Sequence, residues 1–365
     1  MRFGLFSLMT LRDRTTAPRE VVRDTVAMVR LAEEAGFDVA WFAEHHFSNY
    51  SICPSPLMMA AHCAGVTERI RLGAAVLVLP LYRPLRMVQE IALLDVMSGG
   101  RAVVGIGLGY QKFEFDRYGV PLAEKNAVFH EVWDVLEAAL TRGEVAYEGR
   151  YVTVPPTPLT VRPLQRPMPE LFVTGLAPDT LRRTALGGHT PFVTAGWKGL
   201  PVLLEMRSLV ERAYREAGVG TDALPFAVQQ YVHVTDSRAD AREAAERTRA
   251  VGRLVASMRA GDPVLDGPFI REVPMPDEPP LEAFERSVVI GDPEHCAERI
   301  AEEIRLLRPT HYSCFMQIGG LDGRRARRSL ERFAAEVMPL LEREFGPLDR
   351  LNEPAPAGPL AAAGE

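Results

Sequence analysis

The feature that most constrains this chain is a regular alternation of short apolar runs with longer amphipathic segments. Most residues within each run are apolar, which is typical of strands buried on both faces of a parallel sheet. Eight such units in one chain predict the α/β class and a single (β/α)8 TIM barrel rather than a doubly wound sheet. The predicted strands are 2–8, 37–43, 70–80, 101–109, 171–175, 190–196, 225–235 and 310–320, and helical patterns occupy 19–36, 55–67, 83–100, about 123–142, 178–188 and 327–345.

Two segments depart from this alternation. Residues 256–286 are rich in proline and acidic residues and have neither a strand nor a helix period. A long insertion in a barrel is usually a lid or a binding loop, and we expect one here. Residues 347–365 are low in complexity, which predicts a disordered tail after a catalytic domain of residues 1–346.

Composition narrows the class of partner. A net charge of −6 and a pI near 5.9 argue against a nucleic acid and favour a small molecule. No apolar stretch approaches the roughly 20 residues of a membrane span. The four cysteines form no C-x-x-C pair and no leader with a cleavage site is evident, so we expect reduced thiols in a cytoplasmic protein.

The stretch "AEHHF" places Glu44, His45 and His46 where the second predicted strand ends. Barrel enzymes build their sites on this face, and an imidazole titrates near neutrality, so a catalytic acid/base is the favoured interpretation. Successive strand residues point to opposite sides, which argues against a shared metal. Core or surface imidazoles remain the alternative. We predict no metal, because the possible ligands match no zinc spacing: Glu44, His45, Cys53, His62 and Cys63.

Two glycine-containing turns are further candidates. "GIGLGY" (105–110) lacks the G-x-G-x-x-G spacing of dinucleotide sites. Its glycines would allow a flat ligand to approach the backbone, or would serve a turn that needs positive φ, and both readings stay open. "TGLAPDTLRR" (174–183) joins a strand, a turn and a helix N-terminus, which can bind an anion, although every barrel unit has such a terminus.

The blocks "WFAEHHF", "LGAAVLVLP", "ALLDVMSGGR", "GIGLGYQKFEFDRYG" and "IGDPEHCAERI" occur in an order that resembles the bacterial luciferase-like flavin-dependent monooxygenases. The resemblance covers nearly the whole chain. It implies an eight-stranded barrel that takes reduced FMN from a separate flavin reductase. Such an enzyme uses O2, through a flavin hydroperoxide, to insert one oxygen atom into an apolar substrate such as an aldehyde or a terpenoid. It also implies a homodimer.

The resemblance assigns roles to individual residues. His45 would be the general acid/base, with His46 and Glu44 beside it. Ala75 and Val76 match a backbone segment that lies against the flavin ring and in relatives carries a cis non-proline bond. Further matched positions are Glu114, an acid below the flavin pocket, Trp197, close to a tryptophan near the flavin, and the cofactor-binding positions Leu108, Tyr110, Gly175, Leu176, Ala177 and Thr180.

Two of these positions depart from the family pattern. Leu108 stands where relatives have an arginine, and Leu176 stands where they have the serine that binds the flavin phosphate. The phosphate would then depend on backbone N–H groups from Gly175 to Ala177, with Thr180, or on Arg182 or Arg183. A deazaflavin-dependent hydride-transfer enzyme and a catalytically silent flavin-binding protein therefore stay open. The expected substrate pocket is rich in methionine and aromatic residues: Met9, Phe47, Met58, Met59 and Tyr110.

Overall fold

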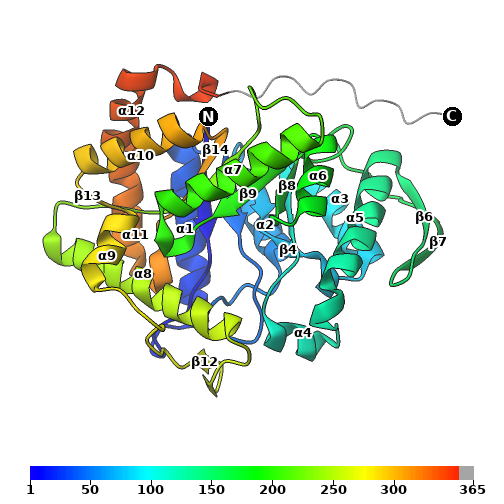
Figure 1. Cartoon of the computed structure of the whole chain (residues 1–365), viewed down its shortest axis with the longest axis horizontal. Helices are drawn as coiled ribbons and strands as arrows, with labels where there is room; N and C mark the ends of the chain where they lie inside the picture. The colour runs from blue at the N-terminus through cyan, green and yellow to red at the C-terminus, as the bar shows by residue number, and fades with distance from the viewer. Residues whose placement is uncertain (353–365) are drawn as a thin grey trace.

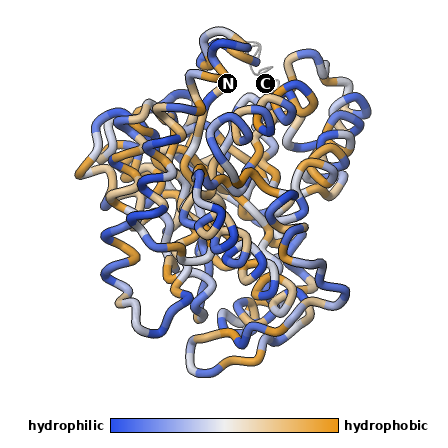
Figure 2. The backbone as a smooth tube through the Cα atoms, turned by 90° about the vertical axis from the view of Figure 1, so that its left-hand side faces the viewer, coloured by the Kyte–Doolittle hydropathy of each residue, from blue (hydrophilic) through white to orange (hydrophobic). Residues whose placement is uncertain are grey.

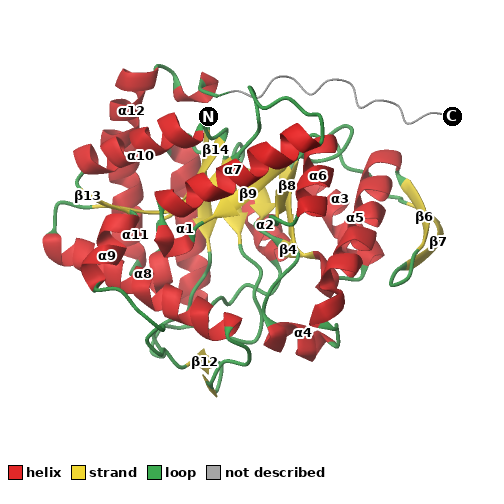
Figure 3. Ribbon diagram, viewed as in Figure 1, coloured by secondary structure: helices red, strands yellow, loops and turns green. Residues whose placement is uncertain are grey.

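The computed structural model describes residues 1–352, and residues 353–365 lie outside the described part. Its centre is a closed barrel of eight parallel strands surrounded by helices (Figures 1 and 3), which confirms the predicted TIM barrel. Each strand pairs with the next around the ring, and β14 closes it against β1. The barrel strands, in spatial order, are β1 (Arg2–Ser7), β2 (Val39–Phe42), β3 (Arg71–Ala74), β5 (Ala102–Gly107), β8 (Leu171–Thr174), β9 (Thr190–Thr194), β10 (Ala227–Val234) and β14 (His311–Phe315).

Within residues 1–352, six short strands lie outside this ring. β4 (Leu77–Val78) pairs with β5, and β13 (Val289–Gly291) extends the sheet beyond β10. Two antiparallel hairpins are formed by β6 (Glu144–Glu148) with β7 (Thr153–Pro158) and by β11 (Leu265–Asp266) with β12 (Phe269–Ile270).

The helices cover the outside of the barrel, so hydrophobic segments gather in the middle of the molecule (Figure 2). They are α1 (Pro18–Glu34), α2 (Pro56–Ala64), α3 (Pro84–Met97), α4 (Lys112–Tyr118), α5 (Lys125–Arg142), α6 (Pro178–Leu186), α7 (Leu200–Glu216), α8 (Arg238–Arg259), α9 (Leu281–Ser287), α10 (Pro293–Leu307), α11 (Gly323–Arg332) and α12 (Met338–Phe345).

Helix burial explains which helices the sequence pattern identifies. In α1 the buried residues Val21, Met28 and Val29 recur at helical spacing, which is the period that predicts an amphipathic helix. The buried face of α8 begins with the alanines Ala241 and Ala245. Alanine contributes little hydrophobic contrast, so the apolar pattern above did not identify α8.

Three predicted boundaries are wrong. The strand expected at 70–80 is interrupted after Ala74 and resumes at β4. The segment 256–286 is not free of regular structure, because it contains the end of α8, the hairpin β11–β12 and most of α9. The boundary predicted for the tail, residue 347, is too early, because Leu348 is buried and lies in a short 3-10 helix. The prediction for residues 353–365 falls outside the described residues.

An aromatic plug fills the lower half of the barrel, toward the N-terminal ends of the strands. The Trp41 ring lies 4.9 Å from Phe172 and 5.3 Å from Phe192, centroid to centroid. A Cβ atom at Gly73 would lie 2.7 Å from the Trp41 ring, so only glycine leaves room for the indole there. Phe6 and other residues above the plug form the floor of a cavity that opens at the C-terminal ends of the strands.

Candidate active site

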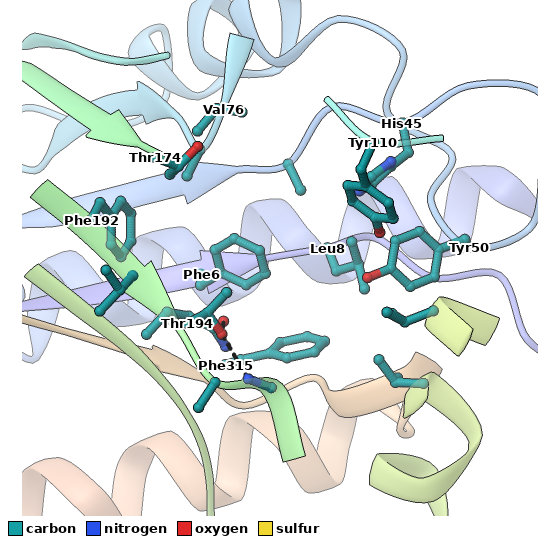
Figure 4. A pocket seen from close by; sticks show the side chains of 18 of the residues that line it. Phe6, Leu8, His45, Tyr50, Val76, Tyr110, Thr174, Phe192, Thr194 and Phe315 are labelled. Atoms are coloured by element: carbon teal, nitrogen blue, oxygen red, sulfur yellow. Dashed lines mark hydrogen bonds between the residues drawn. The ribbon is translucent and has the colours of Figure 1, made fainter. Parts of the chain in front are cut away.

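The cavity has a volume of about 490 Å³, within the range of small-molecule sites. Most of its lining comes from residues at or just beyond the C-terminal ends of the barrel strands, and the rest includes residues of α7 and α8. Figure 4 shows its two ends: Val76 and Thr174 lie at one, and His45, Tyr50 and Tyr110 lie at the other. Position alone therefore makes this cavity the candidate active site.

His45 lines the cavity from the loop after β2. Its Nδ1 atom lies 2.7 Å from Nε2 of Gln111 and 3.3 Å from Oε1 of Glu114. Both partners come from the start of α4, where Gln111 is the N-cap residue. Nδ1 is thus held by the protein, which leaves Nε2 as the ring nitrogen available to a ligand.

His46 points away from the cavity and has a different environment. Its Nε2 atom lies 3.0 Å from Glu44 and its Nδ1 atom lies 3.0 Å from the Tyr118 hydroxyl. Both ring nitrogens are therefore engaged, and the ring is buried. The prediction that the two imidazoles do not share one point is confirmed, and His46 is placed as a support for the loop rather than as a group that meets a ligand.

Glu44 connects the end of β2 to β4. Its Oε2 atom accepts a hydrogen bond from the Tyr82 hydroxyl at 2.6 Å and another from the Val78 backbone N–H at 3.2 Å. Burial and the neighbouring Glu44 carboxylate raise the pKa of Tyr82 well above its usual value. The carboxylate thus fixes the segment that carries Ala75 and Val76, although it also borders the cavity.

The Ala75–Val76 segment borders the cavity, and its peptide bond is cis, as the resemblance implied. The glycines that follow support it from β5. A Cβ atom at Gly107 would lie 2.5 Å from the Val76 side chain, and one at Gly105 would lie 2.2 Å from the Ala74 carbonyl oxygen. These two glycines therefore allow close backbone packing, whereas Gly109 (φ 69°) serves the turn that leads to Tyr110.

Three tyrosines, Tyr50, Tyr110 and Tyr231, line the cavity near His45. Burial raises the pKa of all three phenols, so they stay protonated and act as neutral hydroxyl groups. The hydroxyl groups of Tyr50 and Tyr110 face each other (Figure 4). This end of the cavity therefore presents hydroxyl groups on an otherwise aromatic wall.

The family model described as "luciferase-like monooxygenase" matches residues 1–310. This chain belongs to the luciferase-like monooxygenase family. Family and neighbours are flavin-dependent monooxygenases and oxidoreductases, so the chain is an enzyme of this kind.

Named relatives agree with this membership. The chain is 35% identical over 347 residues to the uncharacterized protein y4vJ of Sinorhizobium fredii, and the aligned region covers 95% of this chain and 99% of the relative. It is 25% identical over 348 residues to the oxygenase component of the flavin-dependent trigonelline monooxygenase of Acinetobacter baylyi, covering 93% and 95% of the two chains. The fold matches the oxygenating constituent of 3,6-diketocamphane monooxygenase from Pseudomonas putida in complex with FMN, with a TM-score of 0.75, 21% identity and 93% and 98% coverage.

Some of the expected cofactor-binding residues of this luciferase-like enzyme line the cavity and others do not. Gly175 and Leu108 line the cavity, whereas Leu176, Ala177 and Thr180 do not border it. Thr180 is buried behind Gly175. Arg183 is bound to Asp134 and Glu137 on the outer face, so it is not available as the substitute cation.

The expected methionine-rich pocket is wrong in most of its members. Among the five residues predicted for it, only Tyr110 lines the cavity. Met58 and Phe47 are exposed, by 72% and 48%, because they lie on the outer side of the segment that follows β2. The aromatic wall comes instead from the barrel strands and includes Phe6, Phe192 and Phe315.

Sequence reasoning missed several polar residues that the structure brings into the site. Gln229 of β10 accepts a hydrogen bond from Thr194 through Oε1, which leaves its buried Nε2 donor without a protein partner. The signal was available, because two glutamines interrupt an apolar strand pattern. Lys198 and Arg259 also line the cavity, but no local pattern in the sequence marks them.

Other predicted features concern chemistry outside this cavity. Within residues 1–352, no group of three or more histidine, cysteine, aspartate or glutamate side chains is placed to hold a metal ion. All four cysteines are free and buried, and burial raises the pKa of Cys53 to about 12, which disfavours a reactive thiolate. Over the same residues, no helix has the length and apolar character needed to cross a membrane.

Proposed function

We propose that this chain is the oxygenase component of a two-component flavin monooxygenase. It would receive reduced FMN from a separate reductase and insert one oxygen atom of O2 into an organic substrate with an apolar body. The observation that carries the proposal is the position of His45, whose available nitrogen shares one cavity with the Ala75–Val76 backbone. The oxygenase component named among the relatives supports the need for a reductase.

The residues at the end of the cavity opposite His45 fit a flavin. Ala75, Val76 and Leu108 offer an apolar surface for a flat ring, and the unpaired Nε2 donor of Gln229 suits a ring acceptor atom or a substrate carbonyl. Thr174 lies at the same end (Figure 4), and it would receive the phosphate together with Gly175, the next residue in the chain. Lys198 of the cavity lining would be a cation that the family pattern did not predict. Reduced FMN would supply the two electrons that activate O2.

The protein's own contribution would be protonation, exclusion of water and orientation. His45 would donate or accept a proton at Nε2 while Gln111 and Glu114 hold the other nitrogen. The aromatic wall would keep bulk water from the reacting atoms. The hairpin β11–β12 would shield the site indirectly, because its Pro268 carbonyl accepts a hydrogen bond from the Asn49 backbone N–H beside Tyr50.

The test is an anaerobic titration of the full-length chain with photoreduced FMN, run in parallel with a reduced deazaflavin. We expect saturable binding of reduced FMN. Mixing the complex with ¹⁸O2 and a panel of organic substrates should then place one ¹⁸O atom in a product. Binding of the deazaflavin alone would favour hydride transfer, and binding of neither cofactor would favour a silent scaffold.

A further inference from the structure

Four charged side chains border the cavity, and they differ in whether protein groups already bind them. The two carboxylates that border it, Glu44 and Glu114, accept hydrogen bonds from protein groups, and the Glu114 charge acts on the neighbouring Tyr110. The two cations that border it, Lys198 and Arg259, have no ion-pair partner within the described residues 1–352. The charged N–H donors of the lining that no acid in the described part of the chain uses therefore belong to Lys198 and Arg259, which are both exposed, and an anionic ligand can accept hydrogen bonds from them.

The two cations belong to separate parts of the lining. Lys198 follows β9, on the loop that also carries Trp197, whereas Arg259 is the last residue of α8. The Arg259 guanidinium lies 5.3 Å from the centre of the Tyr110 ring, so it belongs to the end that holds His45. A flavin phosphate near Thr174 and Gly175 would lie toward the opposite end, which leaves Arg259 for a different ligand.

Two neutral hydroxyl groups, those of Tyr50 and Tyr110, lie near the exposed Arg259, and the Glu114 carboxylate also lies near Tyr110. The phenols of Tyr50 and Tyr110 are kept protonated by burial, and the nearby Arg259 charge opposes only part of the resulting rise in pKa. A guanidinium that has no acid partner, next to hydroxyl donors, matches the planar fork of a carboxylate. Apolar side chains complete this end of the cavity and would hold the rest of the molecule: Phe6, Leu8, Val255 and Phe315.

We propose that the substrate is an organic acid with an apolar or aromatic body, whose carboxylate binds Arg259 and the hydroxyl groups of Tyr50 and Tyr110. This rests on the proposed monooxygenase function and narrows its substrate class. The carboxylate would orient the substrate so that its apolar body lies beside His45. Arg259 is then a residue that determines specificity.

The experiment measures binding to the flavin-free, full-length chain by calorimetry with two matched pairs of probes, benzoate with benzamide and octanoate with octanamide. We expect each acid to bind more tightly than its amide. Arg259→Gln should weaken binding of both acids about tenfold and leave the amides unchanged. Rising salt should weaken acid binding in the wild type and have less effect in the variant, because a charge pair is screened by ions.

The matched control is Arg238→Gln, which removes an exposed guanidinium from the other end of the same helix. Arg259→Lys, which keeps the charge but not the fork, should retain part of the preference for acids, and thermal midpoints confirm that each variant folds. Equal weakening in Arg238→Gln, or no preference for acids in the wild type, overturns the proposal. Loss of FMN binding in Arg259→Gln with unchanged acid binding also overturns it, since Arg259 would then serve the cofactor. Because the probes are tested without flavin, failure here is distinct from failure of the monooxygenase reaction.

Discussion

The two ends of the barrel interior are built from similar residues but have opposite properties. At the lower end, His311 is buried, and its ring centroid lies 4.9 Å from that of Phe172. At the upper end, His45 lies 4.7 Å from the Tyr50 ring, yet it borders an open cavity. Both imidazoles have aromatic neighbours, so the neighbours alone do not decide the role.

The difference lies in what the ring nitrogens meet. His311 shares Nδ1 with the Thr310 hydroxyl at 3.0 Å, and its buried Nε2 has no partner. His45 has Nδ1 anchored by Gln111 while Nε2 is open to the cavity. The two histidines therefore differ in access: the unpartnered nitrogen of His311 is enclosed in the core, which indicates a structural role, whereas His45 borders the cavity, where a ligand can reach it.

The largest expected effect is a loss of turnover, caused by a substitution at the upper end of the barrel. His45→Gln should lower turnover of the substrate found with the panel above by about 100- to 10,000-fold, because a positioned acid/base is lost. The affinity for reduced FMN should change only a few-fold and the thermal midpoint should stay the same. Turnover, cofactor titration and thermal unfolding measure these three quantities.

The control for that variant is His62→Ala, an exposed histidine of α2 outside the cavity, which should leave turnover unchanged. A large drop in the thermal midpoint of His45→Gln, with little loss of turnover per folded molecule, would show that the upper histidine is structural as well.

The next largest effect is a loss of stability, caused by a substitution at the lower end of the barrel. Trp41→Ala should lower the free energy of unfolding by about 3–5 kcal/mol, because it leaves a cavity in the plug against Phe172 and Phe192. Trp197→Ala should lower the free energy of unfolding by clearly less, because Trp197 is partly exposed at the upper end. Urea unfolding compares the two. Equal losses would mean that the plug is no more important for stability than the cavity wall.

The smallest effect is a pH dependence of the free energy of unfolding that comes from His311 at the lower end. Burial lowers the pKa of His311 to about 4. The unfolded chain therefore binds a proton there more readily, and this contribution to stability is present above about pH 6.5 and lost as the pH falls toward 4. The full contribution is about 3 kcal/mol.

His311→Gln tests this sign. The stability of the variant relative to the wild type should improve as the pH falls from 6.5 to 4, measured by urea unfolding at several pH values. A constant difference across this range would show that His311 does not titrate between the folded and unfolded states in the expected way.

The sequence by itself determined the fold class and pointed to the location of the candidate site. Continuous apolar runs encode strands buried on both faces, and a polar "EHH" directly after such a run places His45 at the C-terminal end of the barrel. The resemblance also singled out Ala75 and Val76, which border the cavity. These features are local, since a strand's burial and the residue at its end are written in a few consecutive positions.

Only the tertiary structure decided which side chains meet. It turned His46 away from the cavity toward Tyr118. It also brought Arg259 over the Tyr110 ring, beside His45, although Arg259 follows His45 by more than 200 residues. It also removed Arg183 from consideration by pairing it with acids on the outer face. The physical reason is that closure of the barrel, rather than any local period, fixes the contacts between distant segments and the direction in which each side chain leaves the backbone.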